Sequence, residues 1–286
     1  MINLIRSELY KLGKSGCFKT MIIIGILTVV GVSGIQLWMR NTLSTQISQG
    51  NEVGVAGAAV VDGASNGTVG VTTQATAEDF MEEFDTISGF GNMDDMFNGN
   101  FLQILMAIFT TIFITIEFST GSIKQIASKK YSREAIYLSK LIVCAIGGII
   151  IVFVIGISSF LANSIFFKVG EVPTGFATNF AHFLFASIVV VVAVNGIFQL
   201  IAFVCKSNGL AITINLLFMS MGSNLVTLLG AILKKNINRF WINNMSSEIV
   251  NVTVVSENYW LYIFILLGIA ITTTVAGIVI FKTRDI

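Results

Sequence analysis

Charge and histidine are scarce in this sequence. Only 12% of the 286 residues are charged and 54% are apolar, whereas soluble domains carry roughly 25% charged residues. An ordinary soluble domain is therefore excluded. The net charge of +1 gives no indication of a nucleic-acid partner, and we expect none. The single histidine, His182, has no acid or cysteine near it in the sequence, so we predict no metal site and interpret His182 as an interfacial polar residue.

Cysteine is also rare. The three cysteines are Cys17, Cys144 and Cys205. Their odd number and their spacing fit neither a disulfide framework nor a Cys-x-x-Cys metal site. We therefore interpret all three as small hydrophobic residues.

Catalytic and nucleotide-binding motifs are missing as well. The Gly13-Lys14-Ser15 run is the end of a P-loop pattern, but that pattern requires glycine at position 8, where the chain has Glu8. The apolar segments contain neither a His-Glu-x-x-His pattern nor a nucleophile paired with a base. We expect no catalytic residue and no cofactor-binding residue, and predict that the chain is not an enzyme.

Long apolar runs make up most of the sequence. A transmembrane helix needs roughly 20 mainly apolar residues, and six runs approach or exceed that length. We predict an all-α membrane protein with six transmembrane helices in a single domain, residues 1–286. The predicted spans are residues 20–38, 101–118, 141–167, 180–205, 209–233 and 259–281. In the last span, Gly268, Thr272 and Ala276 are spaced by four, which predicts a stripe for close helix packing.

The first residues have an amphipathic pattern. Ile2, Ile5, Leu9 and Leu12 repeat at helical spacing, with the basic residues off that stripe. We predict an interfacial helix within residues 1–19, lying in the headgroup plane. A cleavable signal peptide shares the basic start and apolar run, but the charged region here is unusually long for one.

Residues 41–100 contain nine acids and no Lys or Arg. Because the flanking segments carry cations, we predict an extracytoplasmic acidic loop. Gly50–Gly70 is rich in small and amide residues, which predicts a mobile stretch. Two interpretations of the acids stay open: they attract a cationic peptide, or they form a solvated face.

The second half of this loop contains a helix signal. Thr76 with Asp79 resembles a helix cap, and Phe80, Phe84 and Ile87 fall on one stripe. We predict a short helix that rests on the membrane or on the spans.

Positive charge dominates residues 117–140. A cluster of Lys and Arg between two spans fixes that loop in the cytoplasm, so residues 119–140 are predicted to form a cytoplasmic loop. Ile123, Ile126 and Ala127 have helical spacing, which predicts a short amphipathic helix within it. The cations of the stretch are Lys124, Lys129, Lys130, Arg133 and Lys140.

The charge count supports one orientation. With both termini in the cytoplasm, twelve cations fall inside and five outside, whereas four acids fall inside and twelve outside. Three of the five outside cations are Lys234, Lys235 and Arg239. They depart from the rule that Lys and Arg are retained on the cytoplasmic side. Six spans with both termini cytoplasmic is the predicted topology.

Several polar side chains lie within the predicted spans. Amides at bilayer depth must face protein or water, and two interpretations stay open: they line a translocation path, or they bond helix to helix. The candidates are Asn195, Gln199, Asn215, Ser220 and Asn224.

One stretch resembles a known family. The pattern Glu117-x-x-x-Gly121-x-x-Lys124-x-x-x-Ser128, followed by Ser132-Arg133, Ile136 and Lys140, is similar to the loop after the second span of ABC-2 type transporter permeases. The opening Met1–Lys14 and the closing Phe281–Ile286 resemble the ends of bacterial bacitracin and lantibiotic export or immunity permeases.

The resemblance implies a permease subunit of an ATP-driven exporter in a bacterial plasma membrane. Its partners would be two copies of an ABC ATPase, which hold the ATP and Mg²⁺, and a second permease chain, identical or homologous. The implied cargo is an antimicrobial peptide or a hydrophobic drug, with antibiotic resistance or lantibiotic immunity as the role. The alternatives are an exporter of a lipid-linked or ionic cargo, and a non-transporting scaffold or sensor that binds peptide through the acidic loop.

The resemblance also implies how the motor is coupled. The stretch after Glu117 would act as a lever pushed by the ATPase, and Glu117 at its hinge would pair with a Lys or Arg, including one on the amphipathic start. The residues assigned to coupling are Glu117, Gly121, Lys124, Ser128, Lys129, Lys130 and Arg133.

Overall fold

The computed structural model describes residues 2–48, 81, 84–95, 100–123 and 131–283. These residues form helices joined by turns and short irregular segments, with no strand among them. Six helices are long and apolar enough to cross a membrane, which confirms the predicted all-α architecture with six transmembrane helices. They are α2 (Gly16–Ser48), α5 (Phe101–Ser119), α7 (Arg133–Phe166), α8 (Phe176–Cys205), α9 (Asn208–Leu233) and α11 (Tyr259–Thr283).

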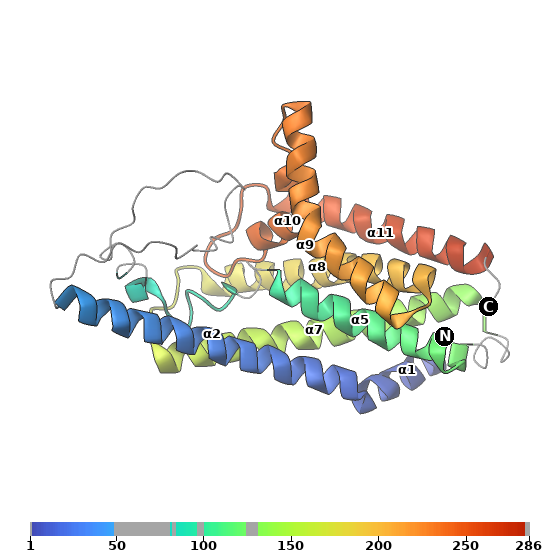
Figure 1. The fold of residues 1–286 in the computed structure, drawn as a ribbon, viewed down its shortest axis with the longest axis horizontal. Coiled ribbons are helices and arrows are strands. Elements are labelled where there is room, and N and C mark those ends of the chain that lie inside the picture. The colour runs from blue at the N-terminus through green and yellow to red at the C-terminus, as the bar shows by residue number, and fades with distance from the viewer. Residues whose placement is uncertain (1, 49–80, 82–83, 96–99, 124–130, 284–286) are drawn as a thin grey trace.

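The shorter helices lie at the ends and in the connections. They are α1 (Ile2–Lys14), the 3-10 helix η1 (Asn238–Phe240) and α10 (Ile242–Ile249). Most of the long helices run side by side along the bundle, and both chain termini lie at the same end of it (Figure 1). We call the end that holds α1 and the last turn of α11 the termini end, and the opposite end the distal end.

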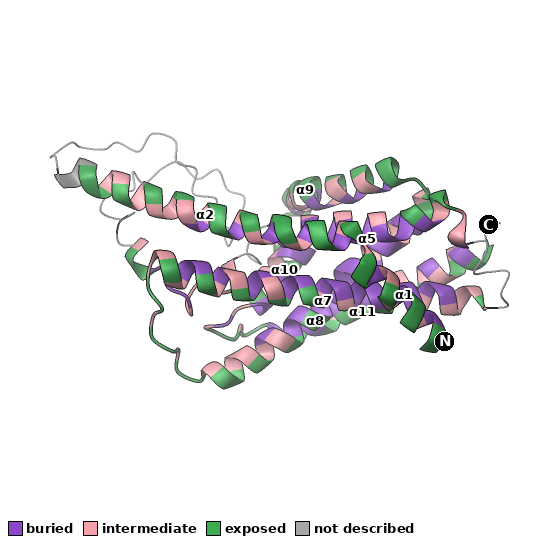
Figure 2. Cartoon of the chain, turned by 90° about the horizontal axis from the view of Figure 1, so that it is seen from below, coloured by how far each residue is buried: buried purple, intermediate pink, exposed green. Residues whose placement is uncertain are grey.

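Helix α8 is the centre of the bundle. It contacts α5, α7, α9, α10 and α11, whereas α2 packs on the outer side of α7 and α5. The inward faces of α5, α7 and α8 are buried, while much of α2 is exposed (Figure 2). The exposed surface is apolar, as expected for helices that face lipid.

Helix α7 begins earlier than the predicted third span. Ser132 caps it, with its hydroxyl accepting a hydrogen bond from the Ala135 N–H at 3.2 Å, and Glu134 lies in the first turn, where the helix dipole favours an acid. The last part of the predicted loop 119–140 is therefore helical. As a result Lys140, predicted to be a loop cation, lies two turns inside α7.

The first helix faces the bundle with a stripe that overlaps the predicted one. Leu12 is buried and Ile5 and Leu9 are partly buried against the core, as predicted, whereas Ile2 is exposed. Leu4 and Glu8 are also buried. An acid therefore occupies the middle of the buried face.

The predicted packing stripe on the last span is also corrected. Gly268 and Thr272 are exposed, and no atom of a neighbouring helix lies within 4 Å of a Cβ built on Gly268. Gly277 is the glycine that permits close approach, because a Cβ there would overlap the Tyr137 ring of α7. The contact face of α11 is thus rotated away from the predicted stripe.

Helix α9 does not stay in the bundle. Its first half buries Ala211, Asn215 and Met219, while its second half projects away from the other helices (Figure 1). Gly222 is buried where a Cβ would overlap the Trp241 ring, and Gly230 is buried against Lys235 and Ile237 of the returning chain. The projecting half carries exposed leucines and isoleucine: Leu225, Leu228, Leu229, Ile232 and Leu233.

Residues 84–95, which we call the distal cap, close the far end of the bundle. The Gly89 N–H donates to the Lys168 carbonyl at 2.9 Å, and the Phe90 N–H donates to the Val169 carbonyl at 3.2 Å. Side chains of α7 hold the other side, with Ser159 and Asn163 donating to the Asn92 carbonyl.

The distal cap covers part of the predicted short outer helix. Residues 84–86 are helical and Ile87 is buried, whereas Thr76, Asp79, Phe80 and the stretch 50–70 lie outside the described residues. Helix α2 runs on to Ser48, so the first part of the predicted loop 41–100 is helical.

Candidate functional site

Four charged side chains meet at the termini end of the bundle. Glu8 and Lys11 lie one turn apart on α1, which places both on the same side of that helix. Glu117 lies in the last turn of α5, and Lys140 lies in the second turn of α7. Three helices that are distant in the sequence therefore contribute to one cluster.

The four groups alternate in charge and form a closed ring. Lys140 Nζ lies 2.6 Å from Glu117 Oε2 and 3.1 Å from Glu8 Oε2. Lys11 Nζ lies 2.8 Å from Glu8 Oε1 and 3.0 Å from Glu117 Oε1. In each carboxylate, one oxygen accepts from Lys11 and the other accepts from Lys140. The four charges sum to zero. We call these four residues the charge ring.

The charge ring is buried on one side and open on the other. Lys140 is 0% exposed, Glu8 1% and Glu117 5%, whereas the Lys11 side chain is 41% exposed. Buried charges are tolerated only when they are paired and hydrogen-bonded, and the alternation meets that condition for all four groups. Removing one member would leave a buried charge without compensation.

Lys11 closes the ring on the solvent side. Burial alone lowers the pKa of its ammonium group, but hydrogen bonds to Glu8 and Glu117 outweigh that effect and raise the pKa above its ordinary value. Lys11 therefore remains charged at physiological pH and keeps its pairing with both carboxylates.

The ring confirms one sequence prediction and adds two residues that were missed. Glu117 does pair with a cation of the amphipathic start, Lys11. Glu8 and Lys140 were not assigned to a site. The available signal was the place of Glu8 between Leu4 and Leu12 at a spacing of four, which puts an acid on an otherwise apolar helix face.

A family model matches residues 66–286 of this chain. The chain belongs to the DUF2705 family, whose members are described as proteins of unknown function. No curated protein matches the chain. Within the charge ring, Glu117 and Lys140 lie inside the matched part of this DUF2705 chain, whereas Glu8 and Lys11 precede it.

Two of the remaining coupling candidates, Gly121 and Arg133, lie at the same end of the DUF2705 chain. Gly121 has a φ of 70°, a left-handed conformation that favours glycine, and it turns the chain just after α5. Arg133 donates to the carbonyls of Phe281 and Lys282 at 3.3 and 3.0 Å, which joins the start of α7 to the end of α11. The other four, Lys124, Ser128, Lys129 and Lys130, lie outside the described residues, as do Ile126 and Ala127 of the predicted amphipathic helix.

Two of the predicted path residues join α5, α7 and α8. Asn195 of α8 accepts a hydrogen bond from the Thr110 hydroxyl of α5 at 2.7 Å and donates to the Cys144 carbonyl of α7 at 3.1 Å. Gln199 donates to the Tyr137 carbonyl at 2.9 Å. All of these groups are buried, so they join α5, α7 and α8 in the interior.

The other three predicted path residues take no part in these bonds between α5, α7 and α8. Asn215 donates to the Thr111 hydroxyl at 2.7 Å and so joins α9 to α5. Ser220 bonds to the Leu216 carbonyl of its own helix and is exposed, as is Asn224. The structure therefore brings Asn195, Gln199 and Asn215 into the interior and leaves Ser220 and Asn224 on the surface.

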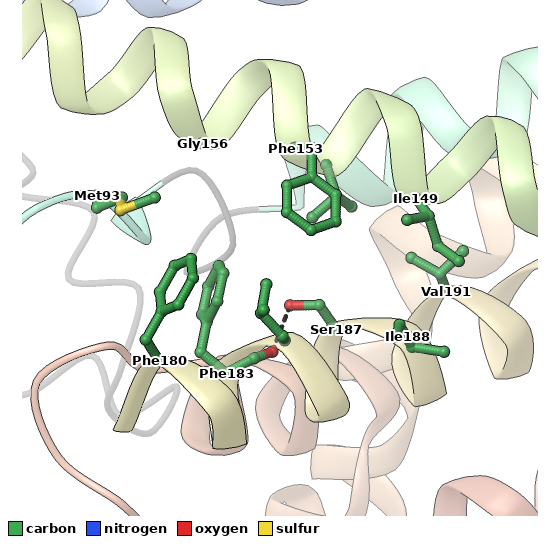
Figure 3. A pocket seen from close by; sticks show the side chains of 11 residues that line it. Met93, Ile149, Phe153, Gly156, Phe180, Phe183, Ser187, Ile188 and Val191 are labelled. Atoms are coloured by element: carbon green, nitrogen blue, oxygen red, sulfur yellow. Dashed lines mark hydrogen bonds between the residues drawn. The ribbon is translucent and has the colours of Figure 1, made fainter. Parts of the chain in front are cut away.

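An apolar cavity lies between α7 and α8 beside the distal cap (Figure 3). Its volume is about 20 Å³. Phe153 and Ile188 are both partly exposed, so the cavity borders the lipid-facing surface. The Ser187 hydroxyl donates to the Phe183 carbonyl of its own helix at 2.7 Å. The lining is therefore apolar: Met93, Ile149, Val152, Phe153, Gly156, Phe180, Phe183, Leu184, Ile188 and Val191, with Ser187.

Proposed function

We propose that this chain is the permease subunit of an ATP-driven exporter, powered by a separate ATPase. The charge ring is the observation that carries the proposal. It ties α1 to the end of α5 and the start of α7, the two helices that flank the stretch assigned to coupling. A force applied to that stretch would therefore move α1, α5 and α7 together.

The proposed orientation puts the termini end in the cytoplasm. Cations of α1, of the start of α7 and of the α11 end lie there, and such clusters are retained on the cytoplasmic side. The ATPase would then reach the chain at Gly121 and the residues after it. Helix α5 ends at Ser119 and the backbone turns at Gly121. A force applied at Gly121 would therefore act on the end of α5, which the ring joins to α1 and α7.

The proposed assembly has two permease chains and two ATPase subunits in a bacterial plasma membrane. ATP and Mg²⁺ would bind to the ATPase, because the chain lacks a nucleotide motif. The buried hydrogen bonds of Asn195 and Gln199 hold α5, α7 and α8 as one block. We infer that this block moves as a unit and does not open between the helices that Asn195 and Gln199 join.

The proposed cargo is a hydrophobic molecule, such as a membrane-active peptide or drug. The lining between α7 and α8 supports this class by its chemistry, because its walls are apolar and it borders the lipid-facing surface. The cavity of about 20 Å³ would have to widen to admit such a molecule. An ionic cargo would need charged groups along the spans, and the buried charges of the described spans are already paired in the ring.

Two glycines provide a matched test of the coupling. Gly121 and Gly175 have φ values of 70° and 73°, and no described atom lies within 4 Å of a Cβ built on either. Valine disfavours this conformation at both sites to a similar degree. We expect Gly121→Val to abolish ATP-driven export of a fluorescent hydrophobic peptide from proteoliposomes, whereas Gly175→Val, at the opposite end, keeps it.

The measurement requires the full chain, extracted gently with the ATPase that purifies with it. Equal thermal stability of the two variants would show that folding does not explain the difference. Absence of a stoichiometric ATPase and of ATP-dependent export from the wild-type preparation would overturn the exporter and favour a membrane scaffold or sensor.

A further inference from the structure

A second cavity lies at the distal end, between α2, the distal cap and the end of α7. Its volume is about 320 Å³. Unlike the cavity between α7 and α8, its lining includes charged side chains. The lining residues are Arg40, Phe84, Asp85, Ile87, Phe167 and Lys168.

Two cations converge on this cavity, Arg40 from α2 and Lys168 from the connection after α7. Arg40 Nη2 lies 2.6 Å from Asp85 Oδ1, and Lys168 Nζ donates to the Asp85 backbone carbonyl at 2.5 Å. The carboxylate therefore neutralises Arg40, while the bond of Lys168 is to an uncharged group. The described lining has two cations and one anion, so it carries a net positive charge.

One hydrogen-bond donor of Arg40 has no acceptor among the described residues. Its Nε is buried and has no hydrogen-bond partner among the described residues. A buried donor without an acceptor costs free energy, and a guanidinium is shaped to give two parallel hydrogen bonds to a phosphate. The unpartnered Nε of a residue that lines the cavity is therefore available to bind an anionic acceptor.

The cavity lies at the depth of lipid headgroups. Trp38 is 67% exposed and precedes Arg40 by two residues, or about 3 Å along the helix. Exposed tryptophans gather at the level of the headgroups. Lys168 follows the last turn of α7, so it reaches the same boundary.

We propose that Arg40 and Lys168 bind the phosphate of an anionic phospholipid at the distal end of the bundle. Phe84, Ile87 and Phe167 form apolar walls beside the two cations. Such a lining suits a phosphate attached to a glycerol and its acyl chains better than a free ion. The site does not depend on the exporter function, because it requires only that the chain lie in a membrane.

The test uses full-length protein in phosphatidylcholine nanodiscs that contain a minority of phosphatidylglycerol. Native mass spectrometry after release into detergent should show retained phosphatidylglycerol on the wild type. Arg40→Gln should lower this retention by about tenfold, the loss expected for one charge-assisted hydrogen bond. Lys234→Gln, an exposed cation beyond α9 and outside the cavity lining, is the matched control and should leave it unchanged.

Two further variants separate binding from folding. Asp85→Asn removes the carboxylate that competes for Arg40, so phosphatidylglycerol retention should rise, whereas a purely structural ion pair predicts no gain. Arg40→Lys keeps the charge but loses the Nε donor, and retention should fall.

The other outcomes overturn the proposal. Equal retention of phosphatidylcholine and phosphatidylglycerol would remove the anionic preference. Retention that is displaced by millimolar inorganic phosphate, with phosphate itself binding to the lipid-free protein, would assign the site to a soluble phosphate group. Unchanged retention in both Arg40 variants would place the bound lipid elsewhere.

Discussion

Lys140 Nζ lies 2.6 Å from Glu117 Oε2 in a place where neither side chain has appreciable contact with solvent. The pair joins α7 to α5, and Glu8 of α1 accepts a second hydrogen bond from the same ammonium group. The relationship explains why α1 packs against the bundle with an acid at the centre of its buried face. It also makes the ring a structural requirement of the fold, independent of the function proposed for it.

Lys140→Met should destabilise the protein strongly. The substitution leaves the carboxylates of Glu8 and Glu117 buried with Lys11 as their only ring partner. Breaking a buried pair by removing one partner costs about 3–5 kcal/mol. Thermal unfolding in detergent, followed by circular dichroism, would measure the loss.

Lys282→Gln is the control for that experiment. Lys282 pairs with Glu134 at the same end of the bundle, but both side chains are about half exposed. Surface pairs of this kind contribute about 1 kcal/mol or less. Equal losses in the two variants would contradict the importance assigned to the ring.

Gly277→Ala should destabilise the contact between α11 and α7. A methyl group at this position would overlap the Tyr137 hydroxyl, and overpacking of this kind costs about 1–3 kcal/mol. Gly268→Ala on the same helix has open space, so the higher helix propensity of alanine should make it neutral or stabilising by up to about 1 kcal/mol. Thermal unfolding of both variants is the measurement, and a reversed order would contradict the helix orientation.

The distal cap should loosen as the pH rises from about 4 to 7. Burial raises the pKa of Asp94 from 3.8 to about 6 and that of Asp95 from 3.8 to about 7. In this window the folded cap binds more protons than the unfolded chain, so stability falls as pH rises and changes little above pH 7. Hydrogen exchange of the Gly89 and Phe90 amides, corrected for intrinsic rates, should show more protection at pH 5 than at pH 8.

The double variant Asp94→Asn with Asp95→Asn is the control for this pH dependence. Amides do not titrate in this range, so the difference in protection between pH 5 and pH 8 should disappear. If it persists at full size, another group is responsible for the effect.

The sequence predicted the helices well because membrane spans are set by length and composition. Five of the six predicted spans fall within long helices, and the third passes the end of α7 by one residue, Phe167. A run of roughly 20 apolar residues satisfies its backbone hydrogen bonds only as a helix in lipid. Helix ends were less predictable. The Ser132 cap and Glu134 start α7 in a basic stretch, where hydropathy alone suggests a loop.

The charge ring was predicted only in part. Glu117 and its pairing with the amphipathic start followed from its place at the end of a span. Lys140 was not recognised, because a lysine next to an apolar run is usually exposed at the membrane surface. Its burial depends on Glu8 from α1, a contact across 132 residues that no local pattern indicates.

The arithmetic of the charge ring bears on how its movement would respond to membrane voltage. Two lysines and two glutamates sum to zero, so shifting the four groups together along the bilayer normal transports no net charge. Moving one elementary charge through 100 mV involves about 2.3 kcal/mol, and the ring avoids that work. The ring itself would therefore add no voltage dependence to a rearrangement of the bundle.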